Sequence, residues 1–117
     1  MKKYLMFCLF VAFIGLTLSG CDSCDQENPS VVLLNNGTDK ADIQIKTSGG
    51  NTENINNIEV GTRSERRTFA PGDIEFTIAI QGVSDEIVYI LSTSFCYDYI
   101  VTINEDNTVT YSSQPRD

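Results

Sequence analysis

Apolar and polar residues alternate along most of the chain from residue 31 onward, and this period of two is its strongest constraint on the fold. Successive side chains of a β-strand point to opposite faces, so the alternation predicts strands with one buried face. Residues 73–81 show the pattern best, because one face gathers Ile74, Phe76, Ile78 and Ile80. The predicted strands cover residues 30–35, 41–47, 53–60, 63–70, 73–81, 86–92, 95–104 and 108–112.

Two of these ranges, 30–35 and 86–92, carry apolar residues on both faces. Such runs are typical of strands covered on both sides, and we expect the second of them to be central. The last range is expected to turn Val109 and Tyr111 inward. Asn36-Gly37 follows the first strand, and Asn-Gly between apolar segments predicts a tight hairpin.

Turn residues separate these ranges about every eight to twelve positions, with no helical period between them. We therefore predict an all-β fold, an antiparallel β-sandwich of about seven to eight strands. The layout resembles immunoglobulin-like or transthyretin-like modules of bacterial lipoproteins. The tryptophan of true immunoglobulin domains is missing, because the chain contains no Trp.

The N-terminal segment has the pattern of an export signal. Lys2 and Lys3 precede an apolar run that is too short to cross about 30 Å of hydrocarbon. Leu18-Ser19-Gly20-Cys21 closes the run and resembles the bacterial lipobox. The resemblance implies a diacylglyceryl lipid on Cys21, cleavage between Gly20 and Cys21, and in many bacteria acylation of the freed amine. An ordinary cleaved signal followed by a cysteine remains the alternative.

The expected organisation is a signal peptide over 1–20, an acidic tether over 21–30 and a β domain over 31–117. Such a protein would be held by lipid at the outer membrane of a Gram-negative bacterium, on its periplasmic or surface face. The acidic run after Cys21 resembles the surface-export signal of lipoproteins in gut-type Bacteroidota. Asp22, directly after Cys21, also resembles the enterobacterial signal for retention in the inner membrane.

Four cysteines reduce to two that can pair. Cys8 would leave with the signal peptide, and Cys21 would carry lipid. Cys24 and Cys96 then remain in an exported protein, where disulfides persist, so we expect a bond between them. Two free thiols are the alternative. Their spacing fits no zinc pattern.

The composition argues against several functions. After residue 20 the chain has six basic and sixteen acidic residues, a net charge of −10, which disfavours nucleic acid as a partner. The chain has no histidine, so a Ser-His-Asp triad and histidine metal ligands are excluded. We expect no enzyme, no cofactor and no metal. The expected attachment to the membrane is through lipid on Cys21, with a protein of the envelope as the possible partner.

Aromatic residues form the first candidate binding site. Phe95, Tyr97 and Tyr99 share one register, and Tyr89 and Tyr111 lie on neighbouring predicted strands. Tyrosine combines an apolar ring with a polar hydroxyl, which suits a sugar- or peptide-binding strip. The competing interpretation is an inner core face, in which only Phe95 and Tyr97 near the strand start are exposed as possible ligand contacts.

Two charged groups are weaker candidates. The turn 104–107 with Asp98 offers oxygen atoms of the kind that bind calcium, although acidic turns are commonly only solvated. Arg63, Arg66 and Arg67 could grip an anionic group or instead pair with neighbouring strands and protect a sheet edge.

The sequence thus predicts a lipid-anchored β-sandwich with a binding or structural role. The alternative is an accessory subunit that captures a glycan or peptide for a surface or envelope-assembly complex. An exposed, contiguous aromatic patch would favour capture, and buried rings would favour a spacer or assembly role.

Overall fold

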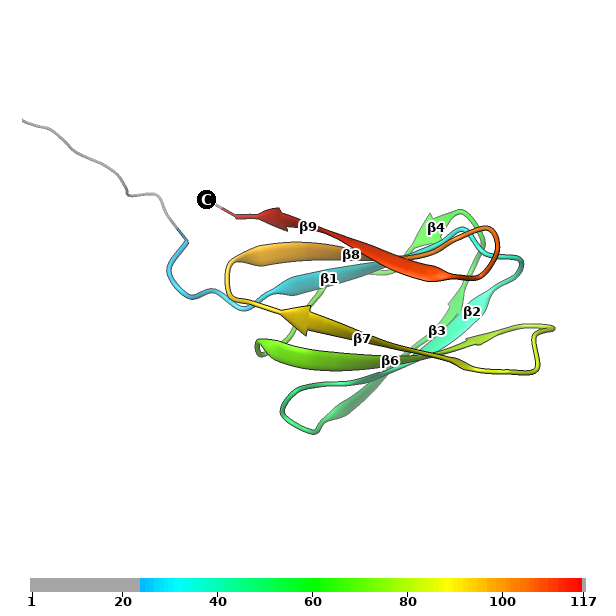
Figure 1. Cartoon of the computed structure of the whole chain (residues 1–117), viewed down its shortest axis with the longest axis horizontal. Helices are drawn as coiled ribbons and strands as arrows, with labels where there is room; N and C mark the ends of the chain where they lie inside the picture. Colours follow the sequence, from blue (N-terminus) through cyan, green and yellow to red (C-terminus); the bar gives the residue numbers. More distant parts are fainter. Residues whose placement is uncertain (1–23, 117) are drawn as a thin grey trace, which may run out of the picture.

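The computed structural model describes residues 24–116, which form two β-sheets packed face to face (Figure 1). One sheet contains β1 (Ser30–Asn35), β4 (Thr62–Arg63), β5 (Arg67–Thr68), β8 (Tyr97–Ile103) and β9 (Val109–Pro115). The other contains β2 (Ala41–Lys46), β3 (Thr52–Ile58), β6 (Gly72–Ile80) and β7 (Ile87–Thr93). The predicted all-β sandwich is confirmed. The range 63–70 was predicted to be one strand, but it contains only the last residue of β4 and the two residues of β5.

The strand order is β4-β1-β8-β9 in one sheet, with β5 also paired to β1, and β3-β2-β6-β7 in the other. All pairs are antiparallel except β1 with β8, which run parallel from Ser30 opposite Asp98 to Asn35 opposite Ile103. The predicted antiparallel arrangement is therefore wrong for this pair. The first two strands lie in different sheets, whereas an immunoglobulin constant-type domain keeps them in one.

The hairpin predicted at Asn36-Gly37 is also wrong, because these residues carry the chain from one sheet to the other. Gly37 is needed there for close approach. A Cβ on Gly37 would lie 2.6 Å from Asn107 Oδ1 and 2.9 Å from a methyl carbon of Ile103. The β1–β2 connection therefore packs directly on the turn between β8 and β9.

The core lies between the sheets and follows the predicted alternation. β2 and β6 have every second side chain buried, and on β6 Ile74, Phe76 and Ile78 have no exposed surface. Each such side chain contributes about 1.5–3 kcal/mol when fully buried. All the buried core side chains belong to residues 31–103, with Val109 packed against them, so the described segment has a hydrophobic core of its own.

The two strands that were expected to be covered on both faces differ. β1 is almost wholly buried, as predicted, and lies in the middle of its sheet. β7 is instead an edge strand, and its outward side chains Val88 and Ile90 are 57% and 60% exposed. β9 is the matching edge of the other sheet, and Tyr111 is 53% exposed rather than buried.

Candidate functional site

The start of β8 lies at the same end of the sandwich as the N-terminal segment (Figure 1). Cys24 is bonded to Cys96, with their Cα atoms 5.7 Å apart, as expected from the sequence. The Cys96 amide donates to the Glu27 carbonyl at 2.8 Å, and the Phe69 amide donates to the Pro29 carbonyl at 3.1 Å. The segment predicted to be an acidic tether is therefore fastened to the body from Cys24 onward. Gly20 and Cys21 lie outside the described residues.

Arg116 fastens the same segment from the C-terminal side. Its guanidinium donates to the Glu27 carboxylate at 2.9 Å and to the Asn28 carbonyl at 2.7 Å. Its buried Nε lies 3.0 Å from Asp98 Oδ1 as an ion pair, without the alignment of a hydrogen bond. The same oxygen accepts a 2.5 Å hydrogen bond from the Ser30 hydroxyl. Both ends of the described chain thus meet at the start of β8.

Next to this fastening lies a row of aromatic rings. The ring centroids of Tyr97 and Tyr99 are 6.1 Å apart, and those of Tyr99 and Tyr111 are 6.3 Å apart, within the range of interacting aromatic pairs. Tyr99 is buried, and its hydroxyl oxygen accepts a hydrogen bond from the Ser94 amide at 3.0 Å. Phe95 and Tyr97 are 41% and 36% exposed, as predicted for the strand start.

A fourth ring, Tyr89, packs against the core from the inward face of β7. Burial raises the pKa of the Tyr89 phenol above its usual value, and the neighbouring Tyr111 phenol raises it further. The aromatic side chains therefore continue from the start of β8 across the open side of the sandwich, between the edge strands β7 and β9.

The acidic candidates are not brought together. Asp98 is the second residue of β8 and is already paired with Ser30, Arg66 and Arg116, whereas residues 104–107 follow the other end of that strand. Asp106 accepts bonds from the Thr108 hydroxyl and amide, which lower the pKa of the Asp106 carboxyl. Within residues 24–116, no group of three or more His, Cys, Asp or Glu side chains is placed to hold a metal ion.

Two of the three predicted arginines form ion pairs. Arg67 bonds Glu53 of β3 and Glu65, both at 2.9 Å, and so links the two sheets. Arg66 lies 3.7 Å from Asp98 and donates to the Ser30 hydroxyl at 2.7 Å. These contacts match the interpretation of the cluster as pairing between neighbouring strands.

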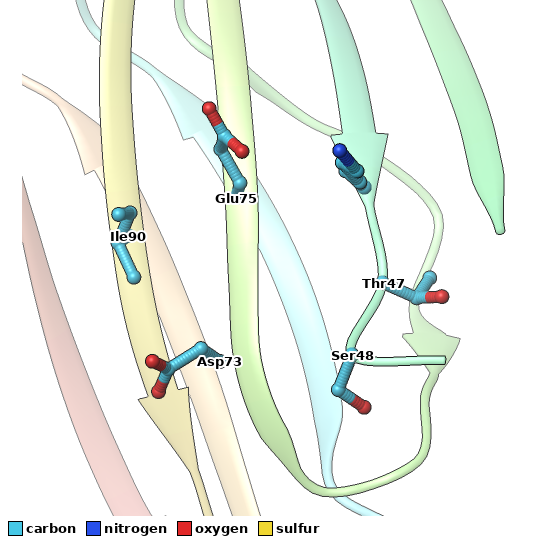
Figure 2. A pocket seen from close by; sticks show the side chains of 6 residues that line it. Thr47, Ser48, Asp73, Glu75 and Ile90 are labelled. Carbon is cyan, nitrogen blue, oxygen red and sulfur yellow. The ribbon is translucent and has the colours of Figure 1, made fainter. Parts of the chain in front are cut away.

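One surface was missed from the sequence. The outward face of the β3-β2-β6-β7 sheet has a shallow pocket lined by Lys46, Thr47, Ser48, Asp73, Glu75 and Ile90 (Figure 2). The apolar side chain of Ile90 lies there beside two carboxylates, with Val88 exposed further along β7. The signal for it was present in the apolar run 87–91, which we interpreted as a covered strand.

Among the described residues, no helix is long and apolar enough to cross a membrane. No protein-family model matches the chain, and no curated protein matches it. Inference about function therefore depends on the residues and the surfaces described above.

Proposed function

We propose that this protein is a bacterial lipoprotein, exported and held by lipid on Cys21 at the outer membrane, with a binding role and no enzymatic activity. The lipobox resemblance supports the anchor. The absence of histidine from the whole chain argues against the commonest general base and so against catalysis at neutral pH.

The disulfide would limit the distance between a lipid on Cys21 and the folded domain. Only three residue steps separate Cys21 from Cys24, and an extended chain spans about 3.3 Å per step, so the lipid would lie within roughly 10 Å of the folded body. Because Cys24 is bonded to Cys96, the start of β8 would face the membrane. The loops at the other end, among them residues 36–39 and the turn before Val109, would face away from it.

The observation that carries a binding role is the partly exposed aromatic row. Phe95 is exposed just before β8 and Tyr97 is exposed at its start, and the Tyr97 ring is followed by the rings of Tyr99 and Tyr111, of which Tyr111 is exposed on β9. The exposed rings on both sides of the buried Tyr99 favour the second candidate function, an accessory subunit that captures a glycan or peptide, over a spacer. Tyrosine rings supply flat apolar area together with a hydroxyl for hydrogen bonding.

Mass spectrometry tests the anchor. The full chain is expressed in a Gram-negative host and purified from the membrane fraction. We expect a mature chain that begins at Cys21 and carries the added mass of acyl chains, whereas Cys21→Ser should remain uncleaved at this site. A chain that begins at Cys21 without added lipid would contradict the proposal.

Affinity electrophoresis tests glycan capture. The chain from Asp22 onward is run in native gels that contain dextran, mannan or xylan. We expect one of these polymers to retard the protein, and Tyr97→Ala or Phe95→Ala to abolish the retardation. Val60→Ala, an exposed change in the turn after β3, is the matched control. Unchanged mobility of the wild type in all three polymers would rule out these glycans and leave peptides as the ligand class.

A further inference from the structure

Among the described residues, β4 and β5 share one outer edge, β9, β3 and β7 form the other three, and of these edges only that of β7 lacks protection against further pairing. β4 is two residues long, and β9 ends in Pro115. β3 carries a register irregularity opposite Ala41–Ile43, where Asn57 has a positive φ of 61°. Short length, proline and bulges are the devices that protect edges from added strands.

β7 has none of these devices. It is seven residues long, Ile87–Thr93, and contains no charge, no proline and no bulge in its pairing with β6. Its outward side chains Val88 and Ile90 are more than half exposed. Proteins normally protect such an edge, because its unpaired N–H and C=O groups form a template for another strand.

The side chains on both faces of β7 are also incompletely covered by the rest of the domain. Outward, Val88 and Ile90 are uncovered; inward, Ile87 and Tyr89 are only partly buried where the sandwich opens towards Tyr111. An added strand would cover both faces, because its side chains alternate between them. This explains why β7 has the sequence of a strand with neighbours on both sides.

The surrounding charge indicates what the outward side chains of the added strand should be. On the outward face Glu75 lies between Lys46 of β2 and Ile90 of β7 in the register, and Asp73 lies opposite Ser92, so the carboxylates are the charges nearest β7 (Figure 2). Glu86 precedes the strand. Neighbouring strands are about 4.8 Å apart, so an added strand would run about 10 Å from β6. A lysine or arginine on it could lay its aliphatic stem over Ile90 and reach Glu75 with its charged end.

We propose that the free edge of β7 binds an extended polypeptide segment by strand addition. The segment alternates lysine or arginine on the outward face with β-branched apolar residues on the inward face. This deepens the proposed binding role and rests on it, by naming peptide as the ligand class. Main-chain hydrogen bonds would hold the segment, and the two faces would select its sequence.

A second copy of this chain fits the edge less well. Self-pairing about a two-fold axis is antiparallel, so the β7 strands would run in opposite directions. Thr93 is three residues from Cys96, so the two Cys24–Cys96 ends would lie at opposite ends of the joint strand pair. With the strands perpendicular to the membrane, lipids attached near the two opposite ends could then not insert into the same membrane. β7 also supplies no basic side chain to meet Glu75.

The test uses a fluorescent peptide of the same length as β7 that alternates lysine and valine, with lysine at both ends. The protein is the chain from Asp22 onward, which retains all the strands, the buried core and the disulfide. At physiological ionic strength, we expect this peptide to bind at least about tenfold more tightly than a scrambled peptide of equal charge. A glutamate–valine peptide should not bind.

Two controls separate strand addition from simple charge attraction. Ile90→Lys should weaken binding about tenfold, whereas Val60→Lys adds the same charge elsewhere and should weaken it much less. N–H groups of alternate residues point to opposite edges of a strand. N-methylation of the lysines or of the valines should therefore abolish binding in one case and preserve it in the other.

Several results would overturn the proposal. They are equal binding of the scrambled peptide, equal effects of Ile90→Lys and Val60→Lys, equal effects of the two methylation patterns, or no binding at millimolar peptide. A dimer of the chain alone that Ile90→Lys dissociates would assign the edge to a second copy. Lipid attachment at Cys21 and glycan retardation are measured separately, so failure here is distinguishable from failure of the proposed function.

Discussion

Cys24 and Cys96 have Cα atoms 5.7 Å apart although 72 positions separate them in the chain. Their bond fastens the segment before β1 to the connection between β7 and β8. In the chain-entropy model, closing a loop of this length stabilises the folded state by roughly 4 kcal/mol. A domain of this size has a total stability of about 5–15 kcal/mol, so the bond accounts for a large part of it.

The double variant Cys24→Ser with Cys96→Ser should therefore fold but lose roughly 4 kcal/mol of unfolding free energy. Urea denaturation followed by circular dichroism measures this loss. Wild-type protein treated with a reductant is the control and should behave like the variant. Equal urea midpoints for the oxidised protein and the variant would show that the bond does not stabilise this fold.

Asn35 organises the other end of the sandwich. Its fully buried amide donates to the carbonyls of Asp39 at 2.9 Å and Ile58 at 2.8 Å, and its oxygen accepts the Gly37 amide at 2.8 Å. Each buried group left without a partner costs about 1–3 kcal/mol. Asn35→Ala should thus lower the unfolding free energy by roughly 3 kcal/mol or more in a urea titration.

Asn54→Ala is the matched control for Asn35, because Asn54 is exposed on β3. Exposed substitutions of this kind are expected to change stability by less than about 0.5 kcal/mol. Equal effects of the two variants would contradict the role assigned to the buried amide.

The strands of this fold could be predicted where burial acts on one face. β2 and β6 alternate in sequence and have every second side chain buried. The pairing of strands could not be predicted, because it depends on contacts between distant residues. Asn36-Gly37 indicates a turn correctly, but nothing local shows that the strands beside it lie in different sheets.

The same limit explains the result for the candidate site. Phe95 and Tyr97 were predicted to be exposed from their place at the strand start, and they are. The apolar run in β7 was interpreted as burial on both faces, because apolar side chains are usually covered. The sequence shows that Val88 and Ile90 need a neighbour but does not show whether that neighbour belongs to this chain.

The ion pair between Arg67 and Glu53 joins the two sheets on the side of the sandwich opposite β7 and β9. Burial disfavours the charged guanidinium, but the bonds to Glu53 and Glu65 outweigh this and raise the pKa of Arg67. The pair is partly exposed to solvent, and such pairs contribute up to about 1 kcal/mol. Arg67→Ala should lower the unfolding free energy by about that amount.

A double-mutant cycle of Arg67→Ala with Glu53→Gln isolates the pair, and high salt should reduce its coupling energy. Arg63→Ala, at an exposed position on β4, is the control. A coupling energy of zero at low salt would show that the contact does not hold the two sheets together.

Tyr89 makes stability depend on alkaline pH. Its pKa is raised in the folded protein, first by burial and then by Tyr111, so folding favours the neutral phenol. The unfolded chain ionises near its usual pKa of about 10. The stabilisation is therefore fully present below about pH 10 and is lost as the pH rises through the higher folded pKa.

Urea midpoints measured across this range should fall above about pH 10, and Tyr89→Phe should make that fall shallower, because the variant has no phenol to ionise. Tyr111→Phe removes only the smaller cause and should keep most of the dependence. Spectroscopic titration of the tyrosinate absorbance should show one late-ionising phenol that disappears in Tyr89→Phe. If Tyr89→Phe retains the wild-type pH dependence, ionisation of Tyr89 is not the cause of the loss of stability above about pH 10.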